Sequence, residues 1–94
     1  MAWTIVEERD AMKAIDGLPP QVGGKYTTWL SVVREQGPQG LRAIKGFRDE
    51  KLSGDLKQLR SSRLNQQWRV IYRVESNVVT VYVERITPHD YRSK

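Results

Sequence analysis

Residues 68–74 combine two arginines with the alternation of a β-strand, a pattern suited to binding phosphate. Side chains of a strand alternate between its faces, so Arg69 and Arg73 share one face. The other face carries apolar side chains fit for a core: Trp68, Val70, Tyr72 and Val74. A guanidinium group offers a planar fork of donors and keeps its charge at physiological pH. The arginines therefore predict a phosphate site, with two solvated arginines on the wet face of a sheet as the alternative.

A second group of residues able to do chemistry lies near the end of the chain, at His89, Asp90 and Tyr91. Cleaving RNA by attack of its own 2′-hydroxyl needs a base, charge stabilisation of the phosphorane and an acid for the leaving oxygen. Two imidazoles suit that work near neutral pH, and this chain has only one histidine. Such an incomplete set fits an enzyme whose substrate is positioned by a larger partner. The alternative is a terminal segment without a chemical role.

Positive charge is concentrated in the middle third of the chain. The net charge is +5, and residues 41–73 alone carry nine Lys/Arg against three Asp/Glu. A block of this kind predicts an anionic partner, with nucleic acid first and an acidic protein second. Four residues of the block are expected to carry this contact: Lys51, Lys57, Arg60 and Arg63.

Length and composition limit the other possibilities. The 94 residues suit one domain spanning positions 1–94. With no cysteine and a single histidine, we expect no metal site, disulfide or cofactor. No apolar run approaches the roughly 20 residues of a membrane span, and no signal-peptide pattern is visible. We therefore expect a cytoplasmic protein with no membrane partner.

The first 40 residues are predicted to form one strand and two helices. Residues 3–7 are rich in aromatic and β-branched side chains, which favours a strand. Residues 8–16 have helical spacing and end at Gly17, and a second helix is expected from Pro20 to Gly37. The apolar stripe of the second helix predicts a core rather than a ligand site: Val22, Tyr26, Trp29, Leu30 and Val33.

The rest of the chain is predicted to form three strands after an irregular stretch at residues 38–54. The strands are expected at 56–64, 67–74 and 78–86, with turns at 65–66 and 76–77. This order predicts an α+β fold, in which two N-terminal helices pack on one face of a small, mostly antiparallel sheet. Arg69 and Arg73 would then stand exposed on the open face.

Three stretches together resemble the HigB branch of the RelE superfamily of bacterial toxins. They are Leu52-x-Gly54-Asp55, the run over residues 61–69, and His89-Asp90-Tyr91. The resemblance covers roughly residues 45–91, about half the chain, and its most specific part is the Arg-Leu-Asn-x-Gln-Trp-Arg series ending at Arg69. It implies the RelE-like microbial ribonuclease fold and the toxin of a type II toxin–antitoxin system.

The activity implied by the resemblance is endonucleolytic cleavage of messenger RNA in the ribosomal A site, by attack of the RNA 2′-hydroxyl. The implied partners are the ribosome, messenger RNA and a cognate antitoxin with a helix-turn-helix DNA-binding domain. Arg69 matches the motif arginine that contacts the scissile phosphate, and Arg63 matches the motif arginine before Leu-Asn. Arg73 lies where relatives often carry a basic residue.

The resemblance also assigns roles to the tail residues, and the sequence departs from the family pattern at two positions. Asp90 and Tyr91 match the segment that closes the active site, and His89 stands where other relatives often carry a basic group. Ser53 replaces a basic residue and Arg60 replaces an aromatic one. Because of these departures, basic contacts are expected to be redistributed to three residues: Lys51, Lys57 and Arg60.

Two other functions fit parts of the sequence. A ParE-like toxin would share the fold and an antitoxin but inhibit DNA gyrase without cutting RNA. A plain RNA-binding module would be expected to expose aromatic side chains between its basic residues. Trp68 and Tyr72 are instead predicted to face the core, which argues against this module. The face of Arg69 and Arg73 with its Asp90-Tyr91 tail favours the nuclease over the gyrase inhibitor.

Overall fold

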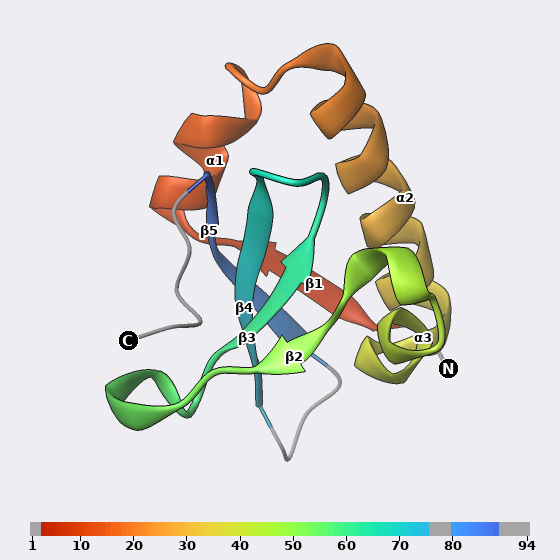
Figure 1. Ribbon diagram of the computed structural model, residues 1–94. Helices are drawn as coiled ribbons and strands as arrows, with labels where there is room; N and C mark the ends of the chain where they lie inside the picture. Colours follow the sequence, from red (N-terminus) through yellow and green to blue (C-terminus); the bar gives the residue numbers. More distant parts are fainter. Residues whose placement is uncertain (1–2, 76–79, 89–94) are drawn as a thin grey trace.

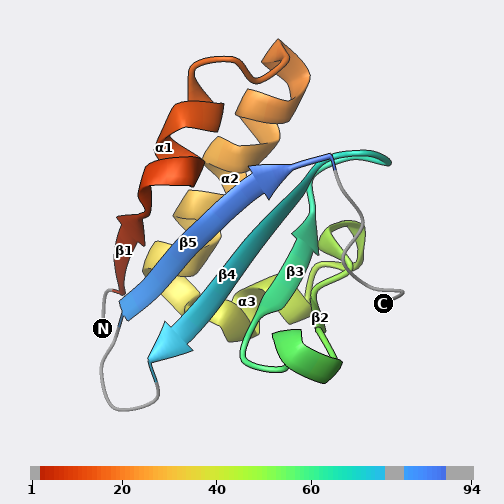
Figure 2. The ribbon, with the colours of Figure 1, turned by 90° about the vertical axis from the view of Figure 1, so that its left-hand side faces the viewer.

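The strands of the computed structural model form one sheet in the order β1-β5-β4-β3-β2 (Figures 1 and 2). The structure describes residues 3–75 and 80–88. β1 is parallel to β5, and the other pairings within this described part are antiparallel. The predicted α+β class and mostly antiparallel sheet are confirmed. The strands are β1 (Thr4–Glu7), β2 (Glu50–Lys51), β3 (Arg60–Arg63), β4 (Arg69–Glu75) and β5 (Thr80–Thr87).

The helices are α1 (Arg9–Ile15), α2 (Pro20–Gln36) and α3 (Pro38–Arg42), and α2 and α3 lie behind the sheet in Figure 2. The first turn of α2 tolerates Pro20 because its missing N–H would have no helical acceptor there. Gly37 ends α2 with a φ of 75°. A Cβ at Gly37 would lie 2.5 Å from the indole ring of Trp3, so both the backbone and the close packing require glycine. No helix in the described part is long and apolar enough to cross a membrane.

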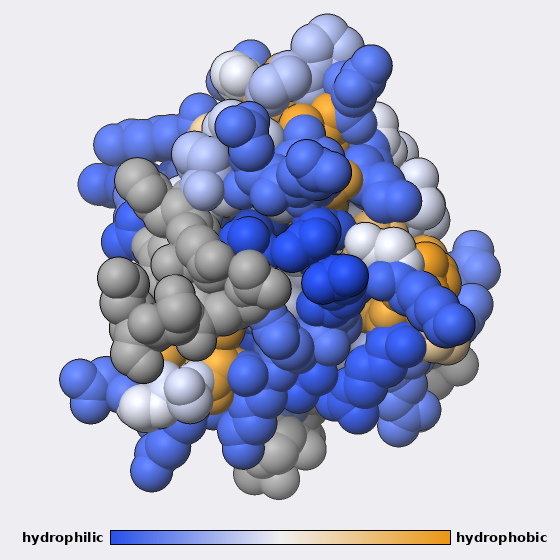
Figure 3. All heavy atoms as spheres, in the orientation of Figure 1, coloured by the Kyte–Doolittle hydropathy of each residue, from blue (hydrophilic) through white to orange (hydrophobic). Residues whose placement is uncertain are grey.

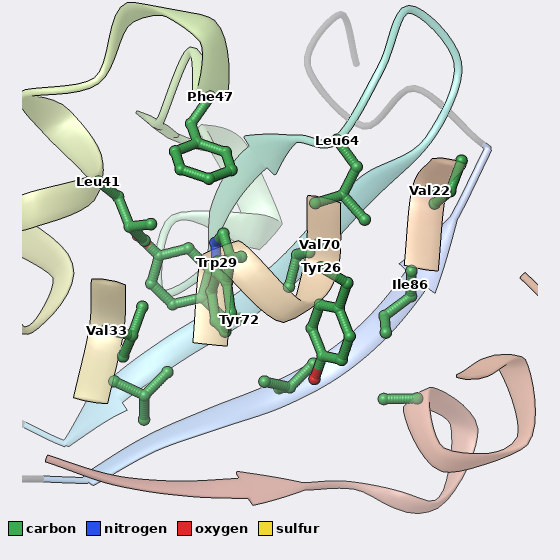
Figure 4. Close-up of a cluster of buried hydrophobic side chains, with 13 residues drawn as sticks. Val22, Tyr26, Trp29, Val33, Leu41, Phe47, Leu64, Val70, Tyr72 and Ile86 are labelled. Atoms are coloured by element: carbon green, nitrogen blue, oxygen red, sulfur yellow. The ribbon is translucent and has the colours of Figure 1, made fainter. Parts of the chain in front are cut away.

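The core lies between α2 and the covered face of the sheet (Figure 4). Trp29 is fully buried, stacks on Tyr26 at 5.8 Å and meets Tyr72 edge-on at 5.4 Å between ring centroids. Val70 and Tyr72 belong to this cluster, as the alternation of β4 predicts. Trp68 only packs against the cluster and is partly buried.

Two sequence predictions about the elements are corrected. The stretch 38–54, expected to be irregular, contains α3, a 3₁₀ turn at Lys45–Phe47 and β2. The strand expected at 56–64 begins only at Arg60, because a second 3₁₀ turn occupies Gly54–Leu56, where Gly54 has a φ of 64°. The turn expected at 76–77 and the first residues of the strand expected at 78–86 lie outside the described residues.

Candidate functional site

Arg63 and Arg69 lie directly opposite each other on β3 and β4. Their neighbour Val70 belongs to the core, so both arginines are on the other face of the sheet, which helices α2 and α3 do not cover (Figure 2). Residues opposed in this way have Cβ atoms about 5 Å apart. At that spacing both guanidinium groups could bind the same phosphate, since each can donate two hydrogen bonds to it.

Arg69 is buried rather than exposed, which corrects the expectation of an open arginine. Only 5% of its surface is accessible. On β5 its register partner is Thr87, itself 8% accessible, so Arg69 lies between Arg63 and Thr87 across three strands. A guanidinium packed into a sheet keeps a defined orientation, and this suits a group that must meet a phosphate at one position.

Arg73 does not form a pair with Arg69. The two residues are four positions apart on β4, which separates their Cα atoms by about 13 Å. Arg73 donates from Nε to Glu84 at 2.6 Å and from Nη1 to Glu75 at 2.9 Å. The hydrogen bond to Glu84, with that to Glu75, raises the pKa of Arg73 against the opposing effect of burial. Two carboxylates therefore compensate the positive charge that the sequence assigned to phosphate binding.

A basic groove of about 360 Å³ opens at the other end of β3, on the side of α3. Its charged lining residues are all cationic: Arg42, Lys51, Lys57 and Arg60. Trp3, Pro38 and Val74 supply apolar lining, and Gln39 and Gln58 complete it. Hydrophilic residues also predominate on the face seen in Figure 3, with few hydrophobic ones among them.

The four residues predicted to bind RNA or a ribosome therefore divide between two places. Lys51, Lys57 and Arg60 line the basic groove. Arg63 lies three residues beyond Arg60 on the same strand, so it points to the opposite face, beside Arg69.

Asp49 binds Arg60, one of the residues that line the basic groove. Sequence reasoning did not identify Asp49 as a site residue. Its carboxylate is fully buried and accepts from Arg60 Nε at 2.8 Å and from Ser62 Oγ at 2.7 Å. The phenol of Tyr72 also donates to it. Burial, and after it the charge of Asp49, raises the pKa of Tyr72. For Arg60, burial alone would lower the pKa, but the hydrogen bond to Asp49 and the charge of Asp49 act in the other direction, and the pKa is raised. Alternation in the sequence places Arg60 and Ser62 on one face of their strand, and only the observed register adds Tyr72 to it.

The remaining predicted site residues are His89, Asp90 and Tyr91, and they lie outside the described residues. β5 ends at Thr87, the register partner of Arg69.

Several solved structures share this architecture. A chain of the archaeal RelE–RelB complex from Pyrococcus horikoshii has a TM-score of 0.69 and 21% identity, over 94% of this chain and 96% of the other. A chain of the DinJ–YafQ toxin–antitoxin complex from E. coli has a TM-score of 0.74 and 16% identity, over 95% and 94%. A YoeB/ParE toxin from Agrobacterium tumefaciens has a TM-score of 0.74 and 16% identity, over 93% and 99%.

No protein-family model and no curated protein matches the chain in sequence. At these identities the structural similarity concerns the fold. The protein has the RelE-like toxin fold, two N-terminal helices and a five-stranded, mostly antiparallel sheet in the described part.

Proposed function

We propose that this protein is the toxin of a type II toxin–antitoxin system, a RelE-superfamily member of the HigB branch that cuts messenger RNA on the ribosome. The observation that carries the proposal is the cross-strand placement of Arg63 and Arg69 on the face that α2 and α3 leave uncovered. The RelE-like fold supports it, as do the residues that resemble the HigB motif.

In the proposed reaction the 2′-hydroxyl of one nucleotide attacks the next phosphate, and the bond to the 5′-oxygen breaks. Arg63 and Arg69 would bind the phosphate and stabilise the charge of the phosphorane. Asp90 is the candidate to take the hydroxyl proton or to orient a neighbour, and Tyr91 to stack on a base or to place its hydroxyl near the phosphate. His89 is the remaining candidate for proton transfer.

Docking on the ribosome is assigned to the basic groove. Its four cations and the absence of an acidic residue among the described lining suit a run of RNA phosphates. The groove and the arginine pair lie on opposite faces of the sheet, so structural RNA and the message would contact different surfaces. The toxin would act in the cytoplasm, where messages are translated.

A cognate antitoxin is the other proposed partner. Two of the similar structures are complexes, RelE with RelB and DinJ with YafQ. We expect the antitoxin of a HigB-type toxin to carry a helix-turn-helix domain. Co-expression with the product of a neighbouring gene should restore growth of cells that produce this protein.

Primer extension on a translated message tests the nuclease. The wild-type protein should produce discrete cuts within codons in the presence of ribosomes and almost none in the same RNA without them. Arg63→Ala should reduce cutting by about 100-fold or more, the scale for losing one donor to a transition-state oxyanion. Arg34→Ala, a change of equal charge on an exposed residue of α2, is the matched control and should cut normally.

The ParE-like alternative is tested in parallel, because the similar toxin from Agrobacterium tumefaciens carries the names of both YoeB and ParE. Inhibition of DNA gyrase supercoiling by the purified protein, with translated messages left intact, would replace the nuclease by that alternative. Equal cleavage of naked and translated RNA would instead remove the dependence on ribosomes.

A further inference from the structure

Arg73 lies over the ring of Tyr82 on the same face of the sheet as the arginine pair. They are register partners on β4 and β5, and their neighbours Val81 and Val83 are in the core. The guanidinium carbon of Arg73 lies 4.0 Å from the centre of the Tyr82 ring. Figure 2 looks onto this face, with β4 and β5 side by side.

Two carboxylates accept hydrogen bonds from the edge of the Arg73 guanidinium, and part of the Arg73 side chain remains exposed to solvent. Glu84 accepts at Nε and Glu75 at Nη1, and 33% of the Arg73 side chain is exposed. The guanidinium thus lies over the Tyr82 ring with its edge bound, and a third of the side chain is open to solvent. A planar cation held in this way can stack on a nucleic-acid base, as arginine and aromatic side chains do in RNA recognition.

The same carboxylates make this end of the face unsuitable for phosphate and suitable for the donors of a base. Glu84 uses only Oε2 for Arg73, and Glu75 only Oε1, and the two side chains are 30% and 49% exposed. A free carboxylate oxygen repels a phosphate but accepts from base N–H groups. Guanine presents two such donors side by side on its Watson–Crick edge, while uracil presents one donor between two carbonyl oxygens.

We propose that Arg73 and Tyr82 form a base-binding platform that, with Glu84 and Glu75, favours guanine in the bound RNA. This assignment deepens the proposed nuclease function and rests on it for the identity of the substrate. Arg69 and Arg73 are about 13 Å apart along β4, a span that an RNA strand covers within a few nucleotides. A phosphate at Arg63 and Arg69 would thus place a nearby base on the platform, and Arg73 becomes a specificity residue.

Nucleotide titration followed by NMR tests the platform without any cleavage. Guanosine 5′-monophosphate should shift the Tyr82 ring and Arg73 Nε–H resonances at a concentration about tenfold lower than uridine 5′-monophosphate, the scale of one additional hydrogen bond to a charged group. Glu84→Gln should remove this difference, because the amide replaces an acceptor with a donor. Glu35→Gln, the same change on an exposed residue of α2, should keep it. Equal shifts with both nucleotides, or none at Tyr82, would overturn the proposal.

Cut-site mapping on translated messages provides the second measurement. Arg73→Ala should change the base preference at the cut sites while total cleavage falls less than tenfold. Arg73→Lys should behave like Arg73→Ala, because an ammonium keeps the ion pairs but lacks the plane that stacks. If Arg73 only stabilises the sheet, lysine restores the wild-type pattern or all sites weaken in parallel, and either result overturns the assignment.

The two measurements separate the two proposals. Intact messages with the wild-type protein, together with guanine-dependent shifts at Tyr82, would reject the nuclease and retain the base site. Normal cleavage with unchanged preference in Arg73→Ala and no shift at Tyr82 would reject the base site and retain the nuclease.

Discussion

Arg60 is bound to the buried carboxylate of Asp49 through both Nε and Nη2, at 2.8 and 2.7 Å from the same oxygen. The side chain of Asp49 has no accessible surface, while 20% of Arg60 is exposed along the basic groove. The other carboxylate oxygen accepts from Ser62 and Tyr72. The Asp49 carboxylate thus connects Arg60, which lines the groove, with Ser62 on β3 and Tyr72 on β4.

The first prediction is that Asp49→Ala strongly destabilises the fold. The change leaves Arg60, Ser62 and Tyr72 without their common acceptor, and breaking a buried ion pair in this way costs about 3–5 kcal/mol. Urea unfolding followed by circular dichroism measures the effect. Asp55→Ala, at an exposed position, should stay within about 0.5 kcal/mol of wild type. A loss below about 1 kcal/mol at Asp49 would contradict the structural role given to this carboxylate.

The second prediction concerns alkaline pH. Burial and the nearby carboxylates Glu7 and Asp49 raise the pKa of Tyr26 and Tyr72, respectively. Above pH 10 the unfolded phenols lose their protons while the folded ones keep them, so the free energy of unfolding should fall as pH rises, by about 1.4 kcal/mol per pH unit for each tyrosine. Urea titrations from pH 9 to 11 measure the slope. Tyr26→Phe should lower it, and a slope unchanged in that variant would be evidence against the shift.

The pairing of Arg63 with Arg69 follows from a turn over residues 65–67, one residue longer than the turn predicted at 65–66, which would have placed Trp68 opposite Arg63. The side chain of Asn65 accepts from the N–H groups of Gln67 and Trp68, at 2.8 and 2.7 Å. Such a turn fixes the register of the two strands that it joins. The sequence analysis identified both Arg63 and Arg69 as site residues but grouped Arg69 with Arg73 on one strand. A separation of four residues along a strand is too long for these two arginines to form a pair.

Two partners, Asp49 of Arg60 and Glu84 of Arg73, could not be predicted because they come from other elements, whereas Glu75 lies two residues from Arg73 on the same face of β4. Asp49 lies in a stretch without helical or strand periodicity, and its contact with Tyr72 spans 23 residues. Glu84 reaches Arg73 at an irregularity between β4 and β5, where the register shifts beside Ile71 and Tyr72. Periodicity predicts faces within one element, but it does not predict which element supplies a counter-charge.

The third prediction separates two tryptophans that the sequence placed together in the core. Trp29 is fully buried between Tyr26 and Tyr72, so Trp29→Ala should cost about 3–5 kcal/mol. Trp68 is only partly buried, and Trp68→Ala should cost clearly less. Thermal melting of both variants decides the order. A larger loss at Trp68 than at Trp29 would mean that the hairpin end of β4 is more important to stability than the helix-facing core.

The last prediction is that Lys51 and Lys57 supply the salt-dependent part of ribosome binding. Both line the basic groove and are exposed, whereas Arg60 there already pairs with Asp49. Removing one phosphate contact should lower the slope of log affinity against log salt by about 1. The double variant Lys51→Ala/Lys57→Ala should therefore reduce the slope by about 2 in sedimentation assays with purified ribosomes, and leave the cut positions unchanged. The control Lys13→Ala/Arg34→Ala removes the same charge from exposed helix positions; equal slopes in the two doubles would exclude the groove as the contact.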